Sequence, residues 1–144
     1  MHAQGTPATM QADPRYDDVL LDVYDWLGAR ITAAEAAGIA RDRIAIDPGI
    51  GFGKTPTHNL ALLRGLSLFH GLGCAIVLGA SRKRFIGTYG GGAAGARAEL
   101  RGPGTIAVTL AALAQGVQVH RVHDIVETRQ ALRLWQAVMS GEGT

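Results

Sequence analysis

The sequence has few charged residues, few aromatic residues and a single cysteine. Of its 144 residues, 18% are charged and 6% are aromatic. Cys74 has no second cysteine for an internal disulfide, and its apolar neighbours predict a buried thiol rather than a nucleophile. No apolar stretch is long enough to cross a bilayer, and the polar N-terminus lacks the apolar segment of a signal peptide. These absences predict a soluble cytoplasmic protein without a membrane partner.

The net charge of +2 is also too small for an extended nucleic-acid-binding surface. The one dense basic run, Arg82-Lys83-Arg84, has no ladder of aromatic side chains beside it on which bases could stack. We therefore expect no nucleic-acid partner, and an anion bound at one site instead. Hydrophobic residues make up 47% of the chain, which is enough to form the core of one domain of this length.

Apolar spacing and turn residues predict an alternation of helices and short strands. Asp13 is a suitable N-cap for the first helix, and Asp124 with Glu127 resembles a capping box before the last one. The glycine-rich stretch over residues 87–104 is predicted to be a mobile loop. Helices are expected over 13–38, 57–70 and 105–114 and after Asp124, and strands over 43–47, 75–78 and 117–122.

This order predicts an α/β fold in which parallel strands alternate with helices. The strands are short and apolar, which is typical of a sheet buried on both faces and built from right-handed βαβ units. Two sheet architectures are compatible with this order, an open doubly wound sheet and a (β/α)8 barrel. A complete barrel takes about 250 residues. With three strands and a further one that ends near Met1 and His2, this chain would form about half of a barrel.

The run over residues 47–55, DPGIGFGKT, is the most distinctive motif. Gly53-Lys54-Thr55 matches the end of a P-loop, but Pro48 stands where that motif needs its first glycine. The dinucleotide fingerprint fails as well, because Lys54 stands where its last glycine belongs. The motif therefore does not predict a nucleotide site.

Asp47 ends a predicted strand, the position at which barrel enzymes place their chemistry. Its carboxylate shares a strand face with the small Ala45 and could accept two N–H groups of a flat heterocycle. It could equally cap its own Pro-Gly turn. Local sequence leaves both interpretations open.

A second polar cluster, Gly79-Ala80-Ser81-Arg82-Lys83, also follows a strand. A hydroxyl, a guanidinium and an ammonium at this place suit an anionic or carbonyl-bearing ligand. The alternative interpretation is a solvated helix start.

The third cluster is His120-Arg121-Val122-His123-Asp124. Residues three apart on a strand point to opposite faces, so His120 and His123 are not expected to hold one metal ion. Arg121 and His123 share a face immediately before a predicted helix N-terminus. This pair predicts an anion site, and barrels often bind phosphate after their last two strands.

Together these motifs resemble bacterial dihydropteroate synthases. The resemblance rests on four motifs in the same order over nearly the whole chain: the start through Gln11, residues 47–54, residues 79–83 and residues 121–124. It implies the C-terminal half of a TIM-type (β/α)8 barrel, with residues 1–144 as a partial pterin-binding domain.

The family condenses 6-hydroxymethyl-7,8-dihydropterin pyrophosphate with 4-aminobenzoate in folate biosynthesis and releases pyrophosphate. By resemblance, Lys83 and Arg121 would be the catalytic residues. Lys83 would contact the pterin carbonyl, and Arg121 would stack on the ring and hold the departing pyrophosphate with His123. The remaining implied substrate-binding residues are Met1 and Asp47 for the pterin, Phe52 and Ser81 for the aminobenzoate, and Gly79.

The chain departs from the family in two respects. Arg84 stands where serine is common, which would alter the rim of the aminobenzoate site. The first four βα units are absent, and with them the asparagine that by resemblance binds Mg²⁺. We therefore expect little activity from the chain alone, and either a homo-oligomer or pairing with an N-terminal half. The competing hypotheses are a non-catalytic fragment or interaction protein, and a methyltetrahydrofolate-binding methyltransferase domain, which Ser81-Arg82-Lys83 disfavours.

Overall fold

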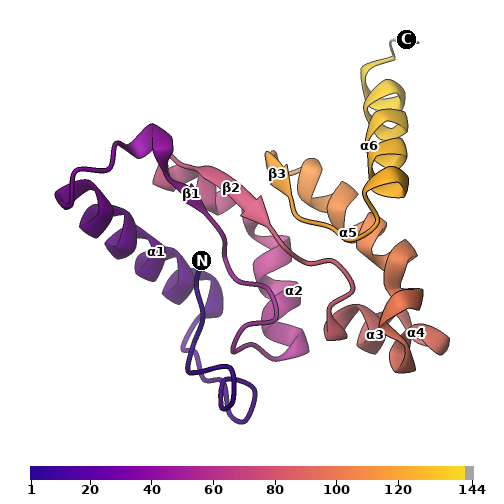
Figure 1. The fold of residues 1–144 in the computed structure, drawn as a ribbon, viewed down its shortest axis with the longest axis horizontal. Helices are drawn as coiled ribbons and strands as arrows, with labels where there is room; N and C mark the ends of the chain where they lie inside the picture. The colour runs from indigo at the N-terminus through magenta and orange to yellow at the C-terminus, as the bar shows by residue number, and fades with distance from the viewer. Residues whose placement is uncertain (142–144) are drawn as a thin grey trace.

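A computed structural model describes residues 1–141, apart from the side chains of Ala94 and Ala96. Three short strands form one parallel sheet in the order β1-β2-β3, and helices connect them (Figure 1). The elements are α1 (Val19–Ala36), η1 (Arg41–Arg43), β1 (Ala45–Ile46), α2 (Pro56–Arg64), η2 (Leu66–Leu72), β2 (Ala75–Leu78), α3 (Arg84–Gly90), α4 (Ala93–Ala96), η3 (Ala98–Arg101), α5 (Gly102–Leu113), β3 (Val119–His120) and α6 (Ile125–Ser140). The predicted alternation of helices with parallel strands is confirmed.

The two faces of the sheet differ in burial. Ile46, Ile76 and Leu78 point toward the helices and are almost fully buried. The alternate residues point the other way: Ala45 and Ala75 are paired across the ladder and exposed. Val119 on the same face is 46% exposed. The inner face of the sheet is therefore open, whereas the outer face is covered. The expectation of burial on both faces is wrong for the described residues, because half of a barrel does not close over its own inner face.

Helix α1 begins later than predicted. Asp18, not Asp13, is its N-cap, and the Asp18 carboxylate accepts the backbone N–H groups of Leu20 and Leu21 at 2.9 and 3.2 Å. Asp13 instead forms an exposed ion pair with Arg15. The predicted apolar stripe is confirmed, and its buried members are Val19, Val23, Leu27 and Ile31.

The predicted helix over 57–70 is divided at Gly65 into α2 and the 3-10 helix η2. The glycine-rich stretch is not a simple loop, because it includes α4 and η3. Buried Arg101 holds this stretch by donating to the carbonyls of Arg82 and Gly95 at 3.0 and 3.2 Å. The mobility of residues 87–104 stays a prediction.

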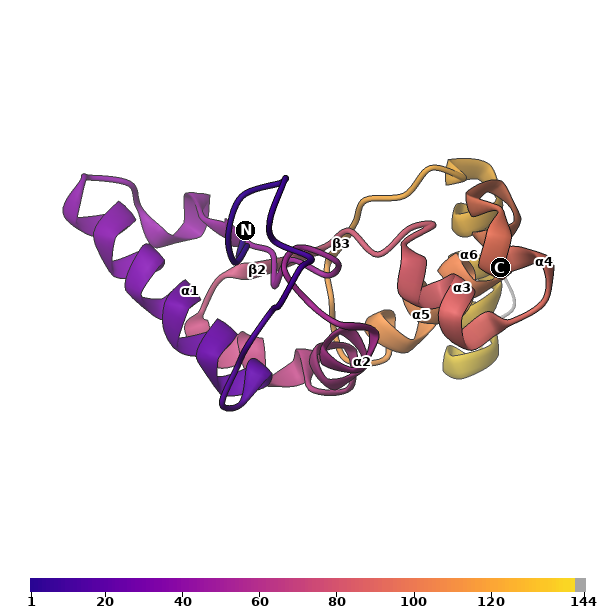
Figure 2. The same cartoon turned by 90° about the horizontal axis from the view of Figure 1, so that it is seen from below.

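Helix α6 stands away from the sheet and packs chiefly against α5 (Figures 1 and 2). Of the residues of α6, only Thr128 is buried, and Ile125 and Met139 are 67% and 66% exposed. Leu134 and Val138 are exposed as well. The helix therefore presents apolar surface that the described residues, 1–141, do not cover. Within residues 1–141, no helix is both long and apolar enough to span a membrane.

Candidate functional site

The three polar clusters meet at one edge of the sheet. Asp47 follows β1, Lys83 lies beyond the end of β2, and Arg121 follows β3 directly. The backbone N–H of Arg121 donates to the Leu78 carbonyl at 2.9 Å, so the ladder between β2 and β3 extends as far as Arg121. Because the strands are parallel, their carboxyl ends lie together. Asp47, Lys83 and Arg121, which the sequence places at or after strand ends, therefore share one edge of the sheet.

The side chain of Lys83 is fixed by the loop after β1. Its Nζ donates to the Ile50 carbonyl and lies 3.8 Å from the centroid of the Phe52 ring. Burial lowers the pKa of Lys83 to about 8; the Asp47 carboxylate opposes this shift, and the charge of Arg121 adds to it. Lys83 is therefore close enough to Asp47 and Arg121 for the charges of both to change its pKa.

The structure shows the turn-capping role of Asp47, and the binding of a heterocycle stays a prediction. One carboxylate oxygen accepts the Gly49 N–H at 2.7 Å, so the residue does close its Pro-Gly turn. The same carboxylate raises the pKa values of Lys54 and Lys83 against the effect of burial. A carboxylate has two oxygens, so the turn leaves acceptor capacity for a ligand.

The guanidinium of Arg121 lies directly over Gly79. A Cβ at position 79 would clash with Nη2 and Cζ of Arg121. Glycine at this position therefore leaves room for the end of the Arg121 side chain, which an added Cβ would displace. Gly79 would contribute to the site by making room for Arg121.

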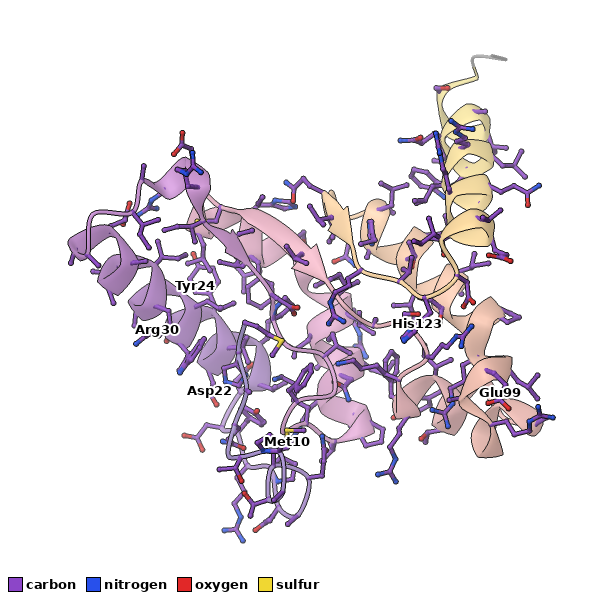
Figure 3. All side chains as sticks on the ribbon, in the orientation of Figure 1. Met10, Asp22, Tyr24, Arg30, Glu99 and His123 are labelled. Carbon is purple, nitrogen blue, oxygen red and sulfur yellow. The ribbon has the colours of Figure 1, made fainter. Side chains whose placement is uncertain are left out.

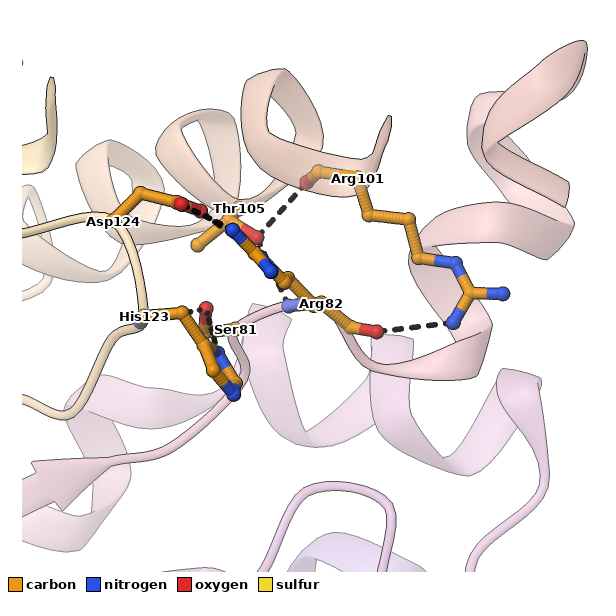
Figure 4. Close-up of polar contacts among 6 residues, drawn as sticks. All are labelled: Ser81, Arg82, Arg101, Thr105, His123 and Asp124. Carbon is orange, nitrogen blue, oxygen red and sulfur yellow. Dashed lines mark hydrogen bonds and ion pairs between the residues drawn. The ribbon is translucent and has the colours of Figure 1, made fainter. Parts of the chain in front are cut away.

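The turn after β3 is joined to the loop after β2 by two side-chain contacts. Ser81 Oγ lies 2.8 Å from Nδ1 of His123, and the Arg82 guanidinium forms an ion pair with Asp124 (Figure 4). Figure 3 shows His123 where these two segments meet. The predicted capping by Asp124 is wrong: Asp124 is the N-cap residue of α6, but its carboxylate binds Arg82 and caps no backbone N–H.

A hollow of about 620 Å³ lies beside Lys83. Phe52 and Arg84 line it, and so does Gln11, which donates to the Gly51 carbonyl at 2.7 Å. Met1 does not reach this hollow. It lies in a separate one of about 310 Å³ between α1 and β1. The cationic residues around the larger hollow are Lys54, Arg82, Lys83, Arg84 and Arg101.

One buried pair escaped the sequence analysis. Lys54 is 3% exposed, and its Nζ lies 2.8 Å from Nδ1 of His2 and donates to the Phe52 carbonyl at 3.0 Å. Burial lowers the pKa of Lys54 to about 7, and burial together with Lys54 lowers the pKa of His2 to about 4. The sequence drew attention to Lys54 through its glycine-rich motif. It gave no signal for the contact with His2, because 51 residues separate the two along the chain.

Comparison with known proteins places this arrangement in a family. The family model described as "Pterin binding enzyme" matches residues 1–123. The chain belongs to this pterin binding enzyme family. It is 45% identical to the dihydropteroate synthase of Neisseria meningitidis serogroup C over 139 residues, which make up 96% of this chain and 48% of that protein.

Solved structures of pterin binding enzymes share the fold. The chain matches dihydropteroate synthase from Stenotrophomonas maltophilia with a TM-score of 0.92 and 42% identity, over 99% of this chain and 52% of that one. For the Thermus thermophilus enzyme in complex with 4-aminobenzoate, the TM-score is 0.86 at 42% identity, over 93% and 53%. The resemblance and the half-barrel fold are confirmed. The chain spans about half the length of these relatives.

No group of three or more His, Cys, Asp and Glu side chains within residues 1–141 is arranged to hold a metal ion.

Proposed function

We propose that this chain supplies the pterin and pyrophosphate side of a dihydropteroate synthase site, for the condensation of 6-hydroxymethyl-7,8-dihydropterin pyrophosphate with 4-aminobenzoate. The observation that carries the proposal is the convergence of Asp47, Lys83 and Arg121 at the carboxyl edge of one parallel sheet, in a chain of the pterin binding family. The complex of a relative with 4-aminobenzoate supports the second substrate.

The charges suit this reaction. When pyrophosphate leaves, negative charge grows on its oxygens and positive charge on the pterin methylene, so fixed cations beside the leaving group lower the barrier. Arg121, placed over Gly79, and His123 would hold the pyrophosphate, while Lys83 would donate to the pterin carbonyl. Asp47 would accept the N–H groups of the pterin. The exposed guanidinium of Arg121 would stack on the pterin ring.

The aminobenzoate would enter through the hollow of about 620 Å³, beside Phe52 and Lys83. Arg84 lies at this hollow in place of the serine common in the family. Met1 would line the pterin pocket only if the missing half brings the two hollows together.

We assign Mg²⁺ to no residue here, and it enters no step that these residues perform. The resemblance to bacterial folate enzymes supports a cytoplasmic location.

The proposed partner of this chain is an N-terminal half-barrel or a second copy. The open inner face of the sheet and the exposed apolar surface of α6 support it. The same surfaces also favour the alternative of a non-catalytic fragment that acts by association. A measurement of dihydropteroate formation distinguishes the catalytic hypothesis from this one.

Titration of the chain with pyrophosphate tests the anion site. Arg121→Ala should weaken binding by about 1.5–3 kcal/mol, because a charge-assisted contact is lost. Gly79→Ala should weaken it too, because the added methyl displaces the guanidinium. Arg129→Ala on exposed α6 is the matched control and should bind as the unaltered chain does. Unchanged affinity in Arg121→Ala would return Arg121 to a structural role.

A further inference from the structure

The hydroxyl of Ser81 makes two contacts with one residue 42 positions away. Its side chain is buried, and Oγ accepts the backbone N–H of His123 at 3.2 Å while lying 2.8 Å from the Nδ1 atom of the same residue (Figure 4). Ser81 thus engages the main chain and the ring of His123 at once.

The direction of the ring hydrogen bond follows from the hydroxyl proton. One lone pair of Ser81 Oγ is already used by the His123 N–H. Within residues 1–141, Nδ1 of His123 is the acceptor that lies within hydrogen-bonding distance of this hydroxyl. Because a buried hydroxyl directs its proton to an acceptor, Ser81 donates to Nδ1, and the ring proton resides on Nε2. Since His123 is exposed, its Nε2–H is open to a ligand.

The neighbouring residue holds the two segments together. Arg82 donates through Nε to Asp124 at 3.1 Å and forms a second contact through Nη2. Its backbone N–H donates to Thr105 Oγ1 at 3.0 Å, and its carbonyl accepts from Arg101 at 3.0 Å. Arg82 also has a φ of 56°, a left-handed conformation that a non-glycine residue keeps only where its surroundings hold it.

We propose that Ser81 is a positioning residue that holds His123 as the Nε2–H tautomer, with the Arg82–Asp124 ion pair keeping the turn after β3 against the loop after β2. His123 would then present a fixed donor beside Arg121 to one anion. The identity of that anion as pyrophosphate rests on the proposed function, whereas the tautomer does not. Direct contact between Ser81 and aminobenzoate is the competing role.

Nitrogen-15 NMR of the chain's histidine rings, with His123 assigned from a His123→Gln variant, tests the tautomer. Neutral His123 should show the Nε2–H form, and Ser81→Ala should introduce a population of the Nδ1–H form. Ser81→Thr, which keeps the hydroxyl, should restore the original spectrum. Ser67→Ala, in η2, is the control. A mixture of tautomers in the unaltered chain, or an unchanged His123 spectrum in Ser81→Ala, would overturn the proposal.

A double-mutant cycle on pyrophosphate binding separates positioning from direct contact. Ser81→Ala should weaken binding about fivefold, which corresponds to the loss of one ordinary hydrogen bond. In a His123→Ala background, the same change should have no further effect, because Ser81 acts through the ring. An equal loss with and without His123 would show that Ser81 contacts the ligand itself and would overturn the proposal. If the unaltered chain binds no pyrophosphate, the proposed function fails, and the tautomer measurement still decides the role of Ser81.

Discussion

At the scale of single residues, the His2–Lys54 pair has a defined pH dependence. Both side chains are nearly inaccessible to solvent, so the ring of His2 can accept from the Lys54 ammonium only while it is neutral. In the folded chain the pKa of His2 is about 4, against 6.5 for the ordinary side chain. Between these values the unfolded chain binds more protons than the folded one, so stability falls as pH falls.

We therefore expect the free energy of unfolding to fall by on the order of 3 kcal/mol between pH 6.5 and pH 4 through His2. His2→Asn keeps an acceptor for Lys54 but does not titrate, so this part of the decrease should disappear. Urea denaturation across the pH range measures it, with His70→Asn as the control at a histidine outside the pair. The same slope in His2→Asn and the unaltered chain would rule out His2 as the cause.

At the scale of elements, α2 is fixed by a capping box that lies beside the site. Thr55 Oγ1 accepts the His58 N–H at 3.1 Å, and the Thr55 N–H donates to Nδ1 of His58 at 3.3 Å. This capping box fixes the start of α2 at Pro56. It therefore also fixes the end of the preceding loop, whose residues Ile50 and Phe52 contact Lys83.

Replacing Thr55 with alanine should lower the free energy of unfolding by about 1 kcal/mol, the usual cost of a lost N-cap. Thr57→Ala is the matched control, because Thr57 is exposed in the first turn of the same helix and should change stability by a few tenths of a kcal/mol at most. Chemical denaturation at neutral pH compares the two. Equal losses would show that the cap contributes nothing specific.

At the scale of the whole molecule, the open sheet face predicts association. The sheet of three parallel strands has β1 and β3 at its edges, and at β1 the His2 N–H donates to the Asp47 carbonyl at 3.0 Å. Such strand edges invite pairing with another chain. Val119 lies on the open face, whereas Leu68, 40% exposed, lies in η2 before the amino end of β2. An exposed apolar face of this kind favours contact with a partner over a monomer.

We expect the purified chain to form oligomers and to make little dihydropteroate, with partial rescue when the N-terminal half of a relative is supplied. Val119→Lys should abolish association and rescue, because it places a charge on the face to be buried. Leu68→Lys should leave both unchanged. Solution mass and dihydropteroate formation are the measurements. Rapid turnover by a monomer of this chain alone would contradict the expectation, which is that three strands without the first four βα units do not position both substrates.

Much of this could be predicted from the sequence. The alternation of apolar strands with amphipathic helices determined the α/β class, because burial on a sheet requires that pattern. The positions of Asp47, Lys83 and Arg121 at strand ends predicted a shared edge, because parallel strands bring their carboxyl ends together. The four motifs in register were sufficient to indicate the family before any coordinates were considered.

Other features depended on contacts between distant residues. The predictions of an Asp124 cap and of a helix start at Asp13 were wrong. The Asp124 carboxylate pairs with Arg82, 42 positions away, whereas Asp13 pairs with its near neighbour Arg15 and Asp18 caps α1. The His2–Lys54 pair and the Ser81–His123 contact join residues 52 and 42 positions apart. The sequence by itself thus determined which groups the chain carries and where the strands end. Only the tertiary structure decided which group bonds to which, because a hydrogen bond depends on separations of about 3 Å that chain spacing does not set.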